Sequence, residues 1–190
     1  QLKMFHPGLI KEVFIVQLRK IFPVLLAVWP YTLFLGKWIQ GTSVEVYLLA
    51  TVLVVAANLA HVVYLKRKGD SHELAFWCRA LKLAHIPYFL LLGLTLFALL
   101  FIIIVPTFVF LVPILAGILL SISYALLLVT SAYGLAAIHQ ERGRNILSKL
   151  YTVGITVLHL IFVADVIGAC LIYGKLKQDQ RNEIEEISVN

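Results

Sequence analysis

The feature that most constrains this chain is a run of 58 residues, Leu83 to Gln140, that contains no Asp, Glu, Lys or Arg. As one straight helix the run would be about 87 Å long, more than twice the roughly 30 Å needed to cross a bilayer. It must therefore fold back, and Pro106 and Pro113 mark the expected bend because proline interrupts helical hydrogen bonding. The run predicts a charge-free hairpin of two spans, residues 82–105 and 107–138.

Composition supports the same class of protein. The chain is 61% hydrophobic and 14% charged, with a mean hydropathy of +0.94, which is outside the range of soluble globular folds. Only helices and closed barrels satisfy their backbone hydrogen bonds in hydrocarbon. We expect an all-α, polytopic transmembrane bundle that forms one integral domain over residues 1–190, with the lipid bilayer as its partner. The net charge of +6 does not indicate nucleic acid, because Lys and Arg gather at the ends of apolar segments.

Outside the hairpin the sequence predicts three more spans, for about five in all: residues 21–40, 46–65 and 150–173. A re-entrant course is the alternative for the first of these, which contains two prolines. Residues 70–82 predict a separate interfacial helix capped at its start by Asp70 or Ser71. Residues 174–190 predict a polar, solvated and partly disordered tail.

The distribution of Lys and Arg predicts the orientation. With the N-terminus inside, twelve of the sixteen basic residues lie on the inner side of the five spans. The outer side carries the other four: Lys37, Lys175, Lys177 and Arg181. The positive-inside rule then favours a multi-pass protein with a cytoplasmic N-terminus and an extracellular C-terminus. A re-entrant first segment would place both termini outside.

Few polar side chains fall within the predicted spans, and together they form the candidate intramembrane site: Asp165, His159, His61, Asn58, His85 and Tyr133. Asp165 lies near the middle of residues 150–173, where an acidic side chain costs about 2.5–3.5 kcal/mol to insert. Such a group usually faces the interior of a bundle or a water-filled cavity. For His61 and His85, which lie near span ends, contact with water or headgroups is the competing interpretation.

His159 and Asp165 are six residues apart, which places them about 120° apart on a continuous helix. We therefore expect no direct bond between them. Asp165 should instead find a polar partner on another helix, with Asn58, His61, Ser131 and Tyr133 as the candidates. Desolvation that keeps the acid neutral is the alternative.

Small residues recur at helical spacing in the last two spans: Gly117, Ser121, Gly134, Ala164 and Gly168. This spacing lets membrane helices approach closely, so we interpret these residues as packing faces. The faces also predict partners, either further copies of this chain or other membrane subunits.

The sequence contains no motif for soluble-type catalysis. Cys78 and Cys170 lie in different segments without a CxxC pairing, which argues against a thiol oxidoreductase and against a thiolate metal site. There is no Walker, HExxH or GxSxG motif. We expect no catalytic residues, no metal and no cofactor. A b-type haem between His61 and His159 is an alternative that only the histidines support.

Three segments together resemble an uncharacterised family of small polytopic membrane proteins from Firmicutes: KLAHIPYF at 82–89, TSAYGLAAI at 130–138 and LHLIFVADVIGACLIY at 158–173. The resemblance covers about the last 110 residues. It implies a bacterial plasma membrane and singles out His85, Tyr133, His159 and Asp165. No activity comes with it.

These observations leave three functional hypotheses. The first is a non-enzymatic subunit or accessory of a larger membrane assembly. The second is a small transporter or a binder of a hydrophobic ligand, with Asp165 as a proton or cation site. The third is an intramembrane enzyme or a haem protein.

Overall fold

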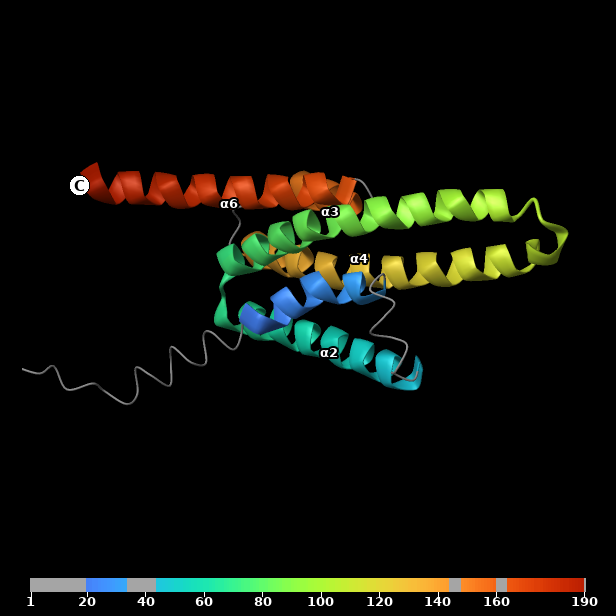
Figure 1. Cartoon of the computed structure of the whole chain (residues 1–190). Helices are drawn as coiled ribbons and strands as arrows, with labels where there is room; N and C mark the ends of the chain where they lie inside the picture. Colours follow the sequence, from blue (N-terminus) through green and yellow to red (C-terminus); the bar gives the residue numbers. More distant parts are fainter. Residues whose placement is uncertain (1–19, 34–43, 144–147, 160–163, 190) are drawn as a thin grey trace, which may run out of the picture. The chain divides into compact units, whose positions relative to one another are not determined.

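The computed structural model describes residues 20–33, 44–143, 148–159 and 164–189, and this part of the chain is helical apart from short turns (Figure 1). Two compact units divide the chain, residues 1–61 and residues 62–190. After a helical stretch at residues 20–28, the elements in order are η1 (Trp29–Leu33), α2 (Val44–Lys68), α3 (Ser71–Ile102), η2 (Pro106–Phe108), α4 (Leu111–Gly143), α5 (Lys149–Leu158) and α6 (Ala164–Val189).

The predicted charge-free hairpin is present. Helices α3 and α4 lie side by side and antiparallel, joined by a turn that contains η2 (Figure 1). Pro106 begins η2, where a missing N–H costs nothing. Across the hairpin, the Tyr88 hydroxyl lies 2.9 Å from Ser123 Oγ, so these two buried hydroxyls satisfy each other.

Helix α3 begins eleven residues before the predicted start of segment three. The side chain of Asp70 accepts a hydrogen bond from the Glu73 backbone N–H at 3.1 Å and caps the helix, as expected. No Gly or Pro follows until Pro87, so the helix continues from Ser71 instead of ending as a separate interfacial helix. This correction moves Lys82 from the end of a span to the interior of α3.

The predicted span over residues 150–173 contains two helices rather than one. Ser148 caps α5, which ends at Leu158, and a second helix, α6, begins at Ala164. A Cβ on Gly168 would lie 3.3 Å from Leu158 Cβ, and Tyr151 lies within electrostatic reach of Asp179. Early residues of α5 therefore neighbour late residues of α6, and the two helices form an antiparallel hairpin. With ten residues, α5 is about 15 Å long, half of what a crossing needs.

Helix α6 packs antiparallel along α3. Asp165 contacts Lys82, and eight residues later on α6 the Tyr173 ring centroid lies 4.8 Å from the guanidinium of Arg79, which precedes Lys82 on α3. The polar tail is helical through Val189, which corrects the expectation of a partly disordered end.

In the N-terminal unit, residues 20–33 pack antiparallel to α2. Asn58 Nδ2 donates to the Phe22 carbonyl at 3.0 Å, and Trp29 Nε1 donates to Thr51 Oγ1 at the same distance. The rest of the predicted first span, residues 34–40, lies outside the described residues.

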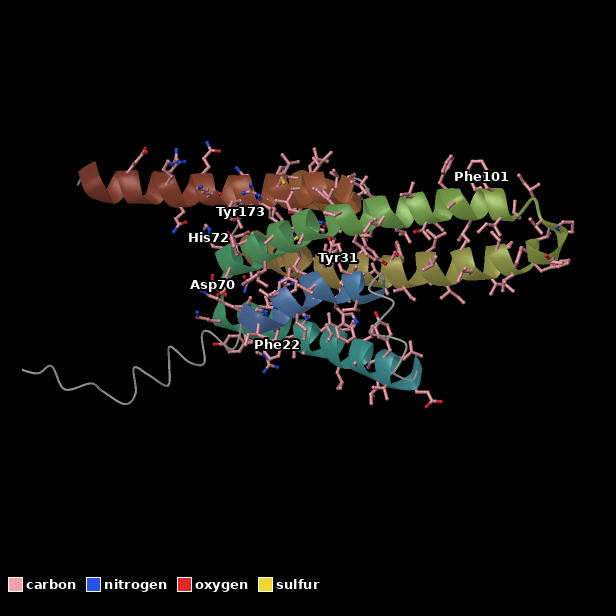
Figure 2. All side chains as sticks on the ribbon, viewed as in Figure 1. Phe22, Tyr31, Asp70, His72, Phe101 and Tyr173 are labelled. Atoms are coloured by element: carbon pink, nitrogen blue, oxygen red, sulfur yellow. The ribbon has the colours of Figure 1, made fainter. Side chains whose placement is uncertain are left out.

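Three of the described helices are long and apolar enough to cross a membrane: Glu45–Lys68, Ser71–Ile102 and Leu111–Gly143. Large apolar side chains project outward along them (Figure 2), with Leu90 at 69% exposed, Phe101 at 59% and Ile114 at 61%. A surface of this kind suits lipid contact. The described residues thus supply three candidate spans rather than the five expected.

Candidate functional site

A buried ion pair joins α3 to the first turn of α6. Lys82 Nζ contacts Asp165 Oδ2, and each side chain is 2% exposed. Lys82 also donates to Ser131 Oγ at 2.7 Å and to the Leu127 carbonyl at 3.3 Å, both on α4. An ammonium group has three N–H donors, so the three acceptors satisfy it completely.

Asp165 has two further partners, and one of them contradicts the sequence analysis. His159 Nδ1 lies 2.6 Å from Asp165 Oδ1, although no direct bond between these residues was expected. The bond forms because the helix does not continue: His159 caps the C-terminus of α5, and Asp165 belongs to α6. Ser131 Oγ lies 3.2 Å from Asp165 Oδ1, which confirms one of the four partners predicted on other helices.

We call Lys82, Ser131, His159 and Asp165 the charged cluster. Its members come from α3, α4, the end of α5 and α6, so every helix of the hairpin pair contributes. Ser131 Oγ also lies 3.2 Å from the His159 backbone carbonyl, which ties α4 to the turn. Paired and hydrogen-bonded in this way, the two opposite charges offset part of each other's desolvation cost.

The contact with Asp165 indicates which ring nitrogen of His159 carries a hydrogen. A carboxylate paired with Lys82 can only accept, so His159 Nδ1 must donate to it. The other nitrogen, Nε2, is fully buried and has no hydrogen-bond partner among the described residues. It faces Gly134: a Cβ on that residue would lie 2.6 Å from Nε2 and 2.9 Å from Cys78 Sγ. This contact leaves no room for a haem macrocycle at Nε2.

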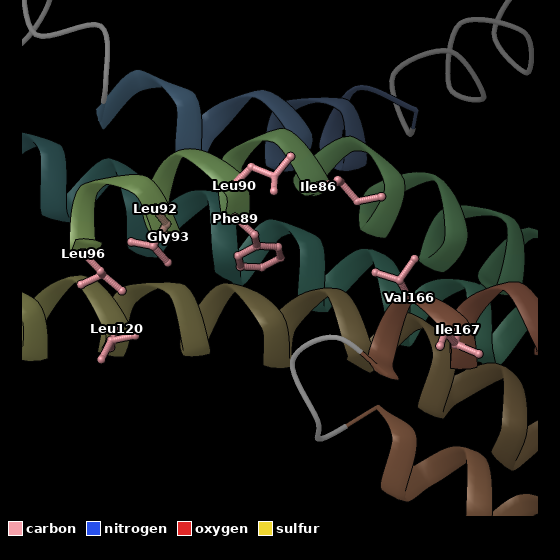
Figure 3. A pocket seen from close by; sticks show the side chains of 9 residues that line it. All are labelled: Ile86, Phe89, Leu90, Leu92, Gly93, Leu96, Leu120, Val166 and Ile167. Atoms are coloured by element: carbon pink, nitrogen blue, oxygen red, sulfur yellow. The ribbon is translucent and has the colours of Figure 1, made fainter. Parts of the chain in front are cut away.

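An apolar groove of about 660 Å³ begins next to the charged cluster. Figure 3 shows its wall, to which α3 contributes Ile86 and Phe89, α4 contributes Leu120, and α6 contributes Val166. Val166 directly follows Asp165, and Ile86 lies one turn after Lys82. A shift of the first turn of α6 would therefore change the ion pair and the groove together.

The other predicted polar residues are buried as well. His85 makes ring contacts with Tyr88 and Phe89, at 6.5 and 6.4 Å between centroids. Tyr133 is fully buried on α4. Asn58 and His61 belong to the N-terminal unit, where Asn58 bonds the Phe22 carbonyl and the His61 ring lies 6.2 Å from the Phe22 ring.

The predicted packing residues fall into two groups. Gly134 and Gly168 face His159 and allow α4 and α6 to approach it closely, while Ala164 is half-buried at the start of α6. Gly117 has nothing within 4 Å of where a Cβ would lie, and Ser121 is exposed one turn later.

Sequence reasoning missed Lys82 and the groove. Lys82 was counted as a basic residue marking the inner end of a span. The absence of any helix breaker from Ser71 to Ile86 was the signal that it lies inside a helix. No local pattern marks the groove, because its walls come from three helices.

Among the residues that the structure describes, no three His, Cys, Asp or Glu side chains gather as a metal-ligand set. No curated protein and no solved structure matches the chain. One protein-family profile does match, over residues 10–178, and its description is a family of unknown function. Because the match covers most of the sequence, the chain belongs to that family, DUF6652.

Proposed function

We propose that this chain is a multi-pass protein of the bacterial plasma membrane in which α2, α3 and α4 cross the bilayer and α5 and α6 form a re-entrant hairpin. The apolar length of α2, α3 and α4 supports the three crossings. The antiparallel packing of a ten-residue α5 against α6 supports the re-entrant course. Residues 21–40 supply a further crossing or re-entrant segment.

Such a hairpin changes the proposed topology. The extracellular C-terminus expected from the sequence depended on a single crossing after Lys149. A re-entrant hairpin returns the chain to the side where α5 begins, so the C-terminus is cytoplasmic, and the N-terminus is cytoplasmic as well when residues 21–40 cross the bilayer. Lys175, Lys177 and Arg181 then join the inner side, which holds fourteen of the sixteen basic residues when the buried Lys82 is left out. The positive-inside rule favours this arrangement over the twelve-to-four division.

Within this topology the protein acts as a small transporter or carrier that binds a hydrophobic ligand, without catalysing a reaction. The observation that carries the proposal is the placement of an apolar groove of about 660 Å³ beside a buried ion pair. A volume of this size matches ligand sites in other proteins. Charges buried within membrane bundles usually mark substrate or ion pathways. Here the ion pair holds the first turn of α6, and that turn forms one wall of the groove.

Filling the groove tests this proposal. Gly93 lines it and has open space around its Cα, so Gly93→Phe should place a ring inside the groove without a backbone clash. Ile118→Trp is the control, because Ile118 is exposed on α4 and is not among the groove-lining residues. Native mass spectrometry of the detergent-purified protein should find a hydrophobic molecule on the parent and on Ile118→Trp but not on Gly93→Phe. Equal occupancy of all three, or none on the parent, contradicts a ligand site in the groove.

A second function, as a subunit or accessory of a membrane assembly, is favoured by the open face around Gly117 and Ser121. This face carries the small-residue spacing that membrane helices use to pack, and no described residue lies within 4 Å of a Cβ built on Gly117. Its partner is another copy of this chain or a different membrane subunit. Gly117→Leu should then lower the oligomeric mass measured by light scattering in detergent, whereas Gly154→Leu should not. An unchanged mass for both variants argues against this face.

A further inference from the structure

One atom of the charged cluster, His159 Nε2, takes part in neither the ion pair nor the groove. It is fully buried, none of the residues that the structure describes bonds it, and Nδ1 on the opposite side of the ring is fixed by Asp165. A buried ring nitrogen without a hydrogen-bond partner destabilises the folded protein by about the free energy of one hydrogen bond. Such an atom therefore suggests a ligand that binds the nitrogen.

A second soft donor lies at the same place. The Cys78 thiol is free and buried on α3, and its Sγ lies 2.9 Å from the point that a Gly134 Cβ would occupy. His159 Nε2 lies 2.6 Å from that point, so Sγ and Nε2 are at most 5.5 Å apart. Typical metal–thiolate and metal–imidazole distances of about 2.3 and 2.0 Å fit within that limit. Because residue 134 is glycine, no side chain fills the space between the two donors.

We propose that Cys78 and His159 form a two-coordinate site for a soft monovalent metal ion such as Cu(I). Thiolate sulfur selects Cu(I), and imidazole is a good second ligand for copper. Ions with a filled d shell and a single charge accept two ligands, so the site needs no third one. The arrangement of Asp165, His159 and the open Nε2 is that of a metal-binding histidine oriented by a carboxylate.

The charges of the cluster select a monovalent ion. Before binding, the Lys82 ammonium and the Asp165 carboxylate offset each other. On binding, the Cys78 S–H bond breaks, its proton passes to the buffer, and an S–Cu bond forms without oxidation or reduction. Cu(I) replaces one positive charge with another, so the buried site stays neutral. A divalent ion would leave one net positive charge in a region where the cluster residues are almost fully buried, which is costly.

Competition with a chromogenic chelator tests this site. The protein, purified in detergent under reducing and anaerobic conditions, is added to the Cu(I) complex of bicinchoninate, and loss of the complex's absorbance measures the copper withdrawn. The parent should withdraw one equivalent per chain. Cys170→Ser, which removes the exposed cysteine, should withdraw the same amount. Cys78→Ser and His159→Gln should withdraw none.

Circular dichroism and thermal unfolding identify variants that fail to fold, and Cys78→Ser is a near-isosteric change that decides the matter if His159→Gln does not fold. X-ray absorption at the copper edge should show one sulfur and one nitrogen neighbour. Copper bound undiminished by Cys78→Ser, copper lost in Cys170→Ser, or Zn²⁺ displacing Cu(I) at equal concentration would each overturn the proposal.

Discussion

Gly134→Ala is the most direct test of the packing around His159. A Cβ at this position would lie 2.6 Å from His159 Nε2, 2.9 Å from His159 Cε1 and 2.9 Å from Cys78 Sγ. All three distances are shorter than ordinary van der Waals contacts. The imidazole cannot simply rotate away, because its Nδ1 is held by Asp165 at 2.6 Å. The methyl group must therefore displace the ring, and with it the turn that carries His159.

The cost follows from two opposing effects. Adding a methyl group to a tightly packed site costs about 1–3 kcal/mol. Replacing glycine by alanine inside a helix stabilises by about 1 kcal/mol. Gly117→Ala provides the matched control, because Gly117 is in the same helix but has nothing within 4 Å. Since the propensity gain is common to both variants, Gly134→Ala should be less stable than Gly117→Ala by about 1–3 kcal/mol.

Thermal unfolding in detergent, followed by circular dichroism, measures the difference. For a chain of this size each kcal/mol shifts the midpoint by about 2–4 °C, so the two variants should differ by about 2–12 °C. Gly117→Ala should unfold at or slightly above the parent's midpoint. If Gly134→Ala unfolds no lower than Gly117→Ala, then α4 does not approach His159 as closely as described and the reasoning fails.

Three further predictions concern the ion pair and the topology. Lys82→Met and Asp165→Leu should each destabilise the protein by about 3–5 kcal/mol, because each leaves one buried charge without its partner. Chemical denaturation of the double variant should show that most of this loss is recovered, and purely additive losses contradict a direct pair. Reporters fused after Lys149 and after Asn190 should both read cytoplasm, and a periplasmic or extracellular reading at the C-terminus refutes the re-entrant hairpin. A cysteine at Thr107 should react with an impermeant thiol reagent added to intact cells, and protection of that position would place the α3–α4 turn on the inner side.

The α3–α4 hairpin was predictable because its cause is local. A charge-free run longer than two crossings must bend, and proline at positions 106 and 113 shows where. That Asp165 has polar partners was also predictable, since a lone acid among apolar residues has to find them. Ser131 was named as one such partner for the same reason, and the structure confirms that contact.

The break between α5 and α6 could not be predicted by the same means. From Ile155 to Ile167 the sequence contains neither Gly nor Pro, so no local signal ends a helix there. The break is explained by contacts distant in sequence: Asp165 bonds Lys82, 83 residues away, and a continuous helix would hold His159 on a different face from Asp165. The predicted absence of a bond between His159 and Asp165 failed because it assumed that helix.

Lys82 was misplaced because basic residues were used as markers of span ends. That rule describes lysines that reach water, and Lys82 has a carboxylate, a hydroxyl and a carbonyl to satisfy it inside the protein. The distinction depends on partners from α4 and α6, which no pattern near residue 82 encodes. Cys78 was set aside for a similar reason: pairing in sequence was sought, whereas its neighbour His159 comes from another helix.

The stability of α5 depends on the charged cluster, which also borders the groove. A ten-residue helix is too short to be stable alone, so its position depends on tertiary contacts. The described contacts at its end are the bond from His159 to Asp165, the bond from Ser131 to the His159 carbonyl, and the close approach of Gly134 and Gly168. Asp165 in turn depends on Lys82, and Val166 beside it forms part of the groove wall. A ligand that displaces Val166 therefore strains the ion pair between Lys82 and Asp165. Loss of that ion pair in turn releases both α5 and the groove wall. Binding in the groove and the position of the α5–α6 hairpin are thus coupled through the first turn of α6.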